Sequence, residues 1–266
     1  MWRMADCMPL SYRTSFMDSL SLTAASGMRA RMESLEMLAN NIANASTGGY
    51  KSDREFYGLY VSADAREPET DGTGASPDSH PNIEKHWTDY SQGALHSTEN
   101  TNDFAISGRG FFAVNGPSGT LYTRNGNFTV SAGGVLTTGD GYPVRTRSGG
   151  TIQTKGTGEP IQVQRDGTVI QDGQNLGQMQ VDTFNESADL NKRGLNYFYR
   201  LDSTKAAEPA KAEVLQGKLE NSNAGPAEGA VRLVSIMRQF EMLQKAMNIG
   251  ADMNRHAIEE VAKVNG

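Results

Sequence analysis

The two ends of the chain carry helical patterns, and the longer pattern constrains the fold most. In residues 226–264 the seam positions recur at alternating steps of four and three, which is typical of a coiled coil: 236, 240, 243, 247, 250, 254, 257, 261 and 264. At 1.5 Å per residue this helix would be about 58 Å long, more than a domain of this size buries along its whole length. We therefore expect its seam to need a partner helix, with packing by Ile236, Phe240, Leu243, Met247, Asn254 and Val261.

The N-terminal pattern predicts that partner helix over residues 17–44. Its apolar stripe combines two rows at steps of seven, and Ala25, Met32 and Ala39 widen it. Asparagines then compete for backbone hydrogen bonds, and Gly48-Gly49 favours a helix end. The stripe alone is compatible with a core helix of a compact domain or with a helix used in assembly. The residues assigned to helix packing and assembly are Met28, Leu35, Leu38, Asn40, Asn41, Ile42 and Asn44.

The middle of the chain has a β pattern with many glycine turns, and two of its motifs are the clearest. In the first, Gly108 and Gly110 separate two strand-like runs, and the whole motif contains Phe104, Ile106, Gly108, Gly110, Phe111 and Phe112. In the second, Asn125-Gly126 lies between two further runs and predicts a hairpin with a type I′ turn. We therefore expect an α+β fold, in which terminal helices pair as a coiled coil around an inserted β domain of irregular sandwich or barrel type.

These patterns divide the chain into six segments. The N-terminal extension has no clear period and is expected to be disordered, and the connector after the first helix is expected to be irregular with a flexible loop at 64–82. In chain order the segments are the extension 1–16, the helix 17–50, the connector 51–82, the β domain 83–200, a second connector 201–225 and the helix 226–264.

Composition excludes several classes of function. The 266 residues carry a net charge of −6 and include 37% hydrophobic residues, with a mean hydropathy of −0.54. Without clustered Lys and Arg we expect no nucleic-acid binding. Without an apolar run of roughly 18 residues we expect no membrane insertion. Asp6 and Pro9 interrupt the first apolar residues, so we expect any export to use a route that ignores a secretory signal.

The sequence contains no recognisable set of catalytic residues. The four histidines lack metal-ligand spacing, and no nucleophile elbow or phosphate-binding loop occurs. Asp103, Asp140 and Asp166 would be the acids of a remote hydrolase alternative, but two of them lie in Asp-Gly turns that explain them. We therefore expect no enzyme activity, no cofactor, no metal and no small-molecule substrate.

Three separated motifs resemble those of the bacterial flagellar rod and hook proteins. The first runs from Ser26-Gly27-Met28 to the asparagine-rich segment 38–51, and the second covers 102–114 with 122–128 and 139–144. The third is Leu219-Glu220-Asn221-Ser222-Asn223 with the closing helix. The three motifs occur in the family's order, so the chain from about 17 to 264 resembles a rod protein, most closely of the type that forms the proximal rod.

The resemblance implies a role that composition does not reveal. Members of the family are axial structural proteins of the flagellar basal body, in the periplasm, and the flagellar type III export apparatus exports them without a signal. Their partners are copies of themselves and neighbouring rod or hook proteins, and their terminal helices enclose the export channel. A distal rod protein is the near alternative, and a secreted adhesin with a coiled-coil stalk is the remote one.

Overall fold

The computed structural model describes residues 10–61, 79–155, 159–184, 190–201 and 208–264 and divides the chain into two compact units. The helical unit comprises Met1–Asn40, Arg54–Trp87 and Ala227–Gly266. The β unit comprises Asn41–Asp53 and Thr88–Pro226. Each unit is therefore built from segments that lie far apart in the sequence.

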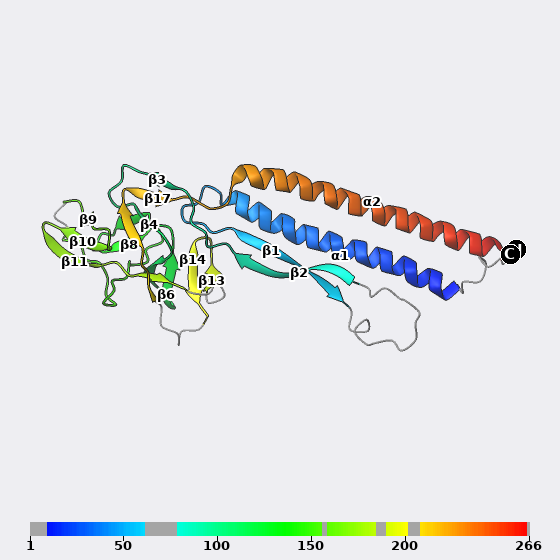
Figure 1. Cartoon of the computed structure of the whole chain (residues 1–266), viewed down its shortest axis with the longest axis horizontal. Helices are drawn as coiled ribbons and strands as arrows, with labels where there is room; N and C mark the ends of the chain where they lie inside the picture. The colour runs from blue at the N-terminus through cyan, green and yellow to red at the C-terminus, as the bar shows by residue number, and fades with distance from the viewer. Residues whose placement is uncertain (1–9, 62–78, 156–158, 185–189, 202–207, 265–266) are drawn as a thin grey trace. The chain divides into compact units, whose positions relative to one another are not determined.

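The helical unit is formed by the helices α1 (Leu10–Ala43) and α2 (Pro226–Val264), whose principal parts lie side by side (Figure 1). α2 has the bounds expected from its seam, and Pro226 is at the first turn, where a missing backbone N–H costs nothing. α1 begins seven residues before the expected start, so the prediction of a disordered segment over 1–16 is wrong for residues 10–16. No glycine or proline occurs between Leu10 and Gly27 to interrupt the helix.

The connector predicted over 51–82 contains regular structure, which is a second correction. β1 (Asp53–Val61) and β2 (Ser79–Thr88) form a two-stranded sheet. β1 is rich in the aromatic residues that favour strands, and β2 supplies its hydrogen-bonding partner. Within the helical unit, Glu55 of β1 forms an ion pair with Arg232 of α2, so this sheet contacts a helix through a salt bridge. The expected flexible loop lies mostly outside the described residues.

The β unit contains fifteen short strands among the described residues. They are β3 (Leu95–Ser97), β4 (Phe104–Ser107), β5 (Phe111–Gly116), β6 (Gly119–Thr123), β7 (Phe128–Val130), β8 (Leu136–Thr138), β9 (Gln162–Val163), β10 (Thr168–Gln171), β11 (Gln174–Gln178), β12 (Val181–Thr183), β13 (Leu190–Arg193), β14 (Tyr197–Arg200), β15 (Glu208–Pro209), β16 (Glu213–Gln216) and β17 (Lys218–Glu220).

All the sheets formed by these described strands are open. The largest has six strands in the order β13-β14-β6-β5-β12-β15, one has the order β11-β10-β9, and β16-β4, β17-β3 and β7-β8 are pairs. The class is therefore α+β, and the predicted barrel alternative is wrong for this part of the chain because no sheet closes on itself.

The β unit also reaches beyond its predicted end at residue 200. β16 pairs antiparallel with β4, so that Val214 lies opposite Ile106, and β17 pairs with β3, so that Leu219 lies opposite His96. The predicted connector 201–225 therefore contributes strands to the sheets. These strands are short and partly polar, and their hydrogen-bonding partners lie more than a hundred residues earlier in the chain.

The hairpin predicted at Asn125-Gly126 is not formed. β6 pairs with β5 and β14, whereas β7 pairs with β8, and neither Asn125 nor Gly126 has a positive φ. The glycine is needed for a different reason, since a Cβ at position 126 would lie 1.7 Å from the carbonyl oxygen of Phe104. A tight turn with two positive φ values occurs instead at Asp172-Gly173, between β10 and β11.

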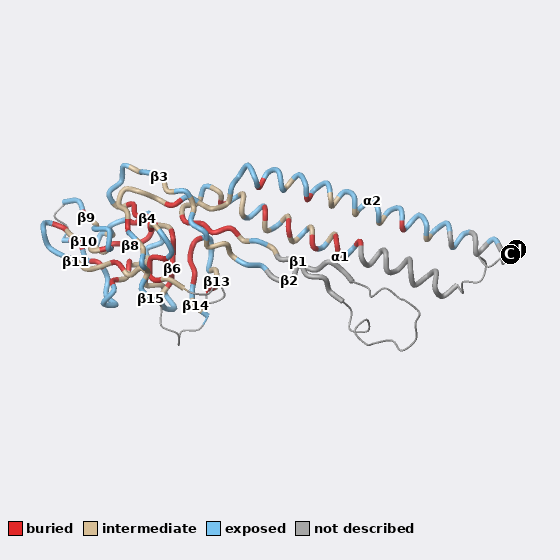
Figure 2. The backbone as a smooth tube through the Cα atoms, in the orientation of Figure 1, coloured by how far each residue is buried: buried red, intermediate tan, exposed pale blue. Residues whose placement is uncertain are grey.

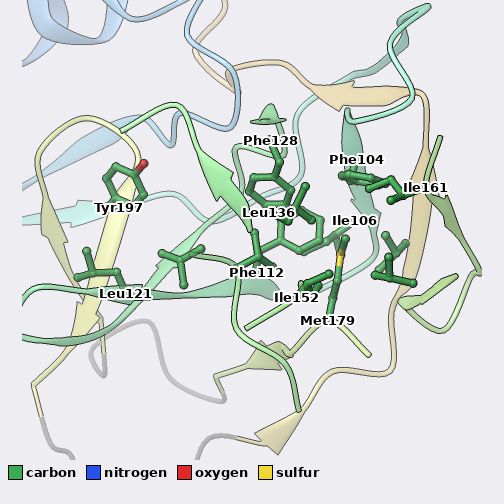
Figure 3. Close-up of a cluster of buried hydrophobic side chains, with 14 residues drawn as sticks. Phe104, Ile106, Phe112, Leu121, Phe128, Leu136, Ile152, Ile161, Met179 and Tyr197 are labelled. Atoms are coloured by element: carbon green, nitrogen blue, oxygen red, sulfur yellow. The ribbon is translucent and has the colours of Figure 1, made fainter. Parts of the chain in front are cut away.

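Two hydrophobic clusters fill the β unit. The larger one gathers side chains from most of its strands, and the ring of Phe128 contacts those of both Phe104 and Phe112 (Figure 3). The smaller one lies around Phe111 and Phe198, on the other side of the six-stranded sheet from Phe112, because successive side chains of a strand point to opposite faces. Figure 2 shows that burial is concentrated in this unit, whereas α2 is mostly exposed.

Candidate assembly faces and the junction cluster

α2 buries one stripe of side chains, which follows the predicted seam. Gly229, Ile236 and Gly250 are buried, and the other positions of the same stripe are partly buried: Leu233, Phe240, Leu243, Met247 and Asn254. Almost all other described side chains of α2 are exposed. The side chain of Val261, which was also assigned to the seam, lies outside the described residues.

α1 offers small residues to this stripe. From Ala24 onward, where the structure describes the burial of this helix, its buried positions are Ala24, Gly27, Ala30, Ser34 and Leu38. A Cβ at Gly27 would lie 3.4 Å from a methyl group of Leu243, so the leucine side chain lies directly beside this position. The contact shows why a small residue suits this turn of α1: it leaves room for a large residue of α2.

The remaining assembly residues of α1 are distributed around the helix. Met28, Leu35 and Ile42 are partly buried, not fully buried. Asn40 is exposed, and Asn44 is buried beyond the last helical residue. The positions that were expected to widen the stripe, Ala25, Met32 and Ala39, are exposed instead. α1 therefore has a covered face of small residues and an outward face with some apolar side chains.

Asn41 lies in the last turn of α1 and binds the chain that follows the helix. Its amide nitrogen donates to the Asp53 carbonyl oxygen at 2.8 Å, and its amide oxygen accepts from the Asp53 backbone N–H at 3.0 Å. The Tyr50 hydroxyl donates to the same amide oxygen at 3.0 Å. Burial raises the pKa of Tyr50 to about 12, and Asp53 contributes, so the phenol stays protonated and keeps this hydrogen bond.

A group of buried charges lies where the segments leading from α1 and into α2 meet. Lys51, Arg124 and Glu220 have side chains that are almost wholly buried, with exposures of 0%, 2% and 0%. The Glu220 carboxylate accepts from Lys51 Nζ at 2.5 Å and from Arg124 Nη1 at 2.9 Å. The Gly93 backbone N–H donates to the same carboxylate at 2.9 Å. We call Tyr50, Lys51, Arg124, Glu220 and Asn223 the junction cluster.

Backbone carbonyl groups complete the environment of the two cations. Lys51 Nζ also donates to the Ser91 carbonyl oxygen at 2.6 Å, and Arg124 Nη2 donates to the Gly108 carbonyl oxygen at 2.7 Å. Burial lowers the pKa of Lys51 and of Arg124, and the carboxylate of Glu220 opposes that shift in both. One carboxylate thus contacts two buried cations, and its loss would remove the ion-pair partner that both share.

Asn223 joins the same segments through the backbone. Its amide oxygen accepts from the Ser52 backbone N–H at 2.7 Å, and its amide nitrogen donates to the Asp89 carbonyl oxygen at 2.7 Å. The Gly49 backbone N–H donates to the Glu220 carbonyl oxygen at 2.7 Å. Residues 49–52 and 220–223 are therefore held together by both side-chain and backbone bonds.

Close backbone approaches explain two glycines of the predicted motifs. A Cβ at Gly49, whose φ is +68°, would lie 2.3 Å from the Asn125 nitrogen. A Cβ at Gly110, whose φ is +152°, would lie 2.8 Å from the Ala210 side chain. Gly108 also has a positive φ of 104°, so the turn between β4 and β5 depends on glycine at both positions.

The three aspartates that a hydrolase would use have structural partners. Asp103 accepts from Asn100 and Asn127, and Asp140 accepts from the Tyr197 hydroxyl at 2.6 Å. Asp166 accepts from the backbone and side chain of Thr168, and these bonds lower its pKa. Within the described ranges, no group of His, Cys, Asp and Glu could hold a metal ion. In the same ranges no helix has the length and apolarity needed to cross a membrane.

The sequence patterns did not predict the junction cluster as a site. All five of its residues lie in or beside the motifs that carry the family resemblance, yet none had an assigned role. A signal was present, because Lys51, Arg124 and Glu220 are charged residues within segments that otherwise contain few charges. What the sequence lacks is any indication that these three positions meet.

Three models of protein families match this chain, over parts of α1, the β unit and α2. A model described as the flagella basal body rod protein matches residues 22–51. The flagellar hook protein FlgE/F/G D1 domain matches 105–171, and the flagellar basal body rod FlgEFG protein C-terminal domain matches 215–260. The first and last matches end or begin close to the junction cluster.

Relatives match over nearly their whole lengths. The flagellar basal-body rod protein FlgF of Caulobacter vibrioides is 31% identical over 94% of this chain and 100% of its own. The rod protein FlgG of Agrobacterium fabrum is 32% identical over 86% of this chain and 94% of its own. FlgG of Bacillus subtilis is 32% identical over 83% and 90%.

Proposed function

This chain belongs to the family of flagellar basal-body rod proteins, and we propose that it polymerises through a coiled coil formed by α1 and α2. Its role is that of a structural subunit of the flagellar rod, and its location is the flagellar basal body. Its partners are copies of itself and other rod or hook proteins. The observation that carries the proposal is the stripe of buried and half-buried residues along α2, which follows the four-three spacing of a coiled-coil seam.

The proposal also specifies the rod segment, the compartment and the export route. The rod segment is the proximal one, inside the periplasm, and the flagellar type III apparatus exports the chain; the distal rod is the alternative. The subunit has no enzyme activity, which is consistent with the structural partners of Asp103, Asp140 and Asp166. Electron microscopy of basal bodies from a strain that lacks the gene tests the segment. A rod that stops before its proximal part is complete supports the assignment, and a complete proximal rod that lacks the distal part contradicts it.

A charge placed in the seam tests the coiled coil. Leu243→Asp should abolish rod assembly and swimming, because it forces a carboxylate into the apolar contact with Gly27. The β unit should remain folded, which near-ultraviolet circular dichroism of the purified variant can show. The matched control is Asn248→Asp, which adds the same charge at an exposed position of the same helix. Normal rods in the Leu243→Asp strain would refute the seam.

A further inference from the structure

The six-stranded sheet of the β unit has a cleft beside two neighbouring strands, β6 and β14 (Figure 1). β6 pairs with β5 along its whole length, but it pairs with β14 only at Tyr122 and Thr123. Beyond Tyr122 that pairing stops, and a cleft of about 680 Å³ is lined by both strands. Its described lining consists of residues 118–122, Arg193 at the end of β13, and Tyr199 and Arg200 of β14.

The strand ends at this cleft have edges that are free to pair. Among the described residues, the segment 119–121 of β6 and the segment 199–200 of β14 have no strand partner on the sides where the two strands are neighbours. An unpaired edge presents N–H and C=O groups to which another extended chain can bind. The cleft therefore suits an extended peptide, which can form main-chain hydrogen bonds along such an edge.

The charge of the cleft is positive. Arg193 and Arg200 line it, and none of its described lining residues is acidic. The guanidinium of Arg200 lies 5.7 Å from the centre of the Phe184 ring, and within the described ranges its buried Nε has no hydrogen-bond partner. Arginine binds carboxylates with two parallel hydrogen bonds, so the cleft favours an acidic ligand.

Exposed apolar side chains gather beside the same cleft. Leu195, Tyr199 and Leu201 are 53%, 38% and 61% exposed, and they lie within seven consecutive residues that include β14. In the described part of the β unit, Val130 is the other large apolar side chain that is exposed. Single exposed apolar residues need no explanation, but tyrosine and arginine grouped with leucines are typical of a surface that binds a protein segment.

The pairing of β13 with β14 places the two arginines on opposite faces of the sheet. Arg193 lies opposite Tyr197, and Arg200 follows Tyr197 by three residues on β14. Directly opposite residues share a face, whereas residues an odd number apart along a strand do not. The levels of the two arginines differ by about 10 Å along the strand. An added strand would therefore reach both with acidic side chains that are three residues apart.

We propose that this cleft binds an extended acidic segment of a partner protein, which pairs with the free edges of β6 and β14 and places carboxylates against Arg193 and Arg200. A second copy of this chain fits less well. The edge strands β9, β11 and β13 of the two larger sheets carry no acidic residue, and β15 carries only Glu208. The site does not depend on the coiled coil of α1 and α2.

Fluorescence anisotropy with the purified full chain and labelled octapeptides tests the site. The first peptide, Thr-Val-Glu-Thr-Val-Glu-Val-Thr, has its glutamates three residues apart. The second, Thr-Val-Glu-Thr-Glu-Val-Val-Thr, has the same composition with the glutamates two apart, and the third replaces both glutamates of the first by glutamine. The first should bind about fivefold more tightly than the second and about tenfold more tightly than the third. If the second or the third binds as tightly as the first, the proposal is overturned.

Variants of the chain identify the residues that bind. Arg193→Gln changes an exposed side chain and should weaken binding of the first peptide about fivefold. Arg200→Lys keeps the charge but removes the planar fork, and should weaken it about threefold. The matched control is Arg165→Gln, because Arg165 is 79% exposed and is not part of the cleft, and it should leave the affinity unchanged. Unchanged affinity in Arg193→Gln would overturn the proposal.

Two further measurements test the mode of binding and the source of the ligand. Methylation of the three valine amide nitrogens in the first peptide should weaken binding about tenfold, because it removes main-chain donors. Retained affinity would rule out pairing with the strand edges. An Arg193→Glu chain, whose own cleft is disabled, should not displace the peptide from the native chain. Displacement would show that a second copy is the occupant, which would overturn the assignment to a partner protein.

Discussion

Glu220 is the residue on which most of the junction cluster depends. It is wholly buried and serves as the counter-ion for Lys51 and Arg124, while its own carbonyl oxygen accepts from Gly49. Buried ion pairs add little stability when compared with well-packed apolar residues, but removal of one partner is costly. The cluster therefore specifies how residues 49–52 contact residues 220–223. A conformation without these contacts is destabilised, because it leaves a buried charge unpaired.

Replacement of this carboxylate should destabilise the β unit strongly. Glu220→Gln keeps the size of the side chain but removes the carboxylate that the buried Lys51 and Arg124 share, which costs about 3–5 kcal/mol. Denaturant unfolding followed by tyrosine fluorescence measures the loss. Glu213→Gln is the matched control, because that carboxylate is 56% exposed and lies 3.8 Å from Arg165, so its replacement should change stability by less than about 1 kcal/mol. Equal effects of the two changes would contradict the role of the cluster.

Gly126 shows why a correct motif can have the wrong explanation. Asn-Gly was interpreted as a hairpin turn, whereas the glycine is required because β4 passes directly over it. Gly126→Ala should therefore destabilise the β unit by about 3 kcal/mol or more, since the Cβ would overlap a backbone oxygen that cannot move independently. Gly139→Ala is the control, because no atom lies within 4 Å of a Cβ at that position. Thermal melting of the two variants side by side decides the point.

At the scale of elements, the helices were largely predictable and many strands were not. A helix buries its stripe at a spacing that is visible within its own sequence, so α2 could be bounded from one segment alone. β16 and β17 have no such internal signal, because they are held by hydrogen bonds to β4 and β3. β1 and β2 were missed for the same reason, since the long segment between them hides their pairing from any local window.

The covered face of α1 allows a prediction by residue size. Gly27→Ala should be tolerated or raise helix stability by up to about 1 kcal/mol, because alanine favours a helix and its Cβ would make ordinary contact with Leu243 at 3.4 Å. Gly27→Phe should disrupt the contact, since the ring would need the space that Leu243 fills. Hydrogen exchange of the α1 amides, measured for both variants, reports the effect. Protection that falls for alanine as much as for phenylalanine would contradict the packing of Leu243 against this glycine.

At the scale of the whole molecule, the sequence predicted the class of the fold and the family but not the boundaries of its units. The end helices, the β middle and the rod family were all evident from periodicity and motifs. The β unit, however, includes residues 41–53 and ends at Pro226, far outside the predicted limits of 83 and 200. The junction cluster is the cause, because it attaches the segments that flank both helices to the sheets.

This division predicts which fragment of the chain folds on its own. A protein consisting of residues 41–226 keeps every member of the junction cluster and all strands of the β unit, so it should unfold cooperatively. A fragment 54–226 loses Tyr50 and Lys51 and should be less stable by about 3 kcal/mol or more, because the buried Glu220 loses one of its two cationic partners.

The fragment 83–200, which sequence patterns alone would select, should not fold. It lacks β16 and β17, which leaves β4 and β3 without their hydrogen-bonding strands, and it lacks the carboxylate that neutralises Arg124. Thermal unfolding of the three fragments by circular dichroism should therefore rank them 41–226, then 54–226, then 83–200 without a transition. Adding Glu220→Gln to 41–226 should lower its stability toward that of 54–226, since both changes break the same buried group. A stable 83–200 fragment would show that the strands within these residues are sufficient for folding and that the junction cluster is not required.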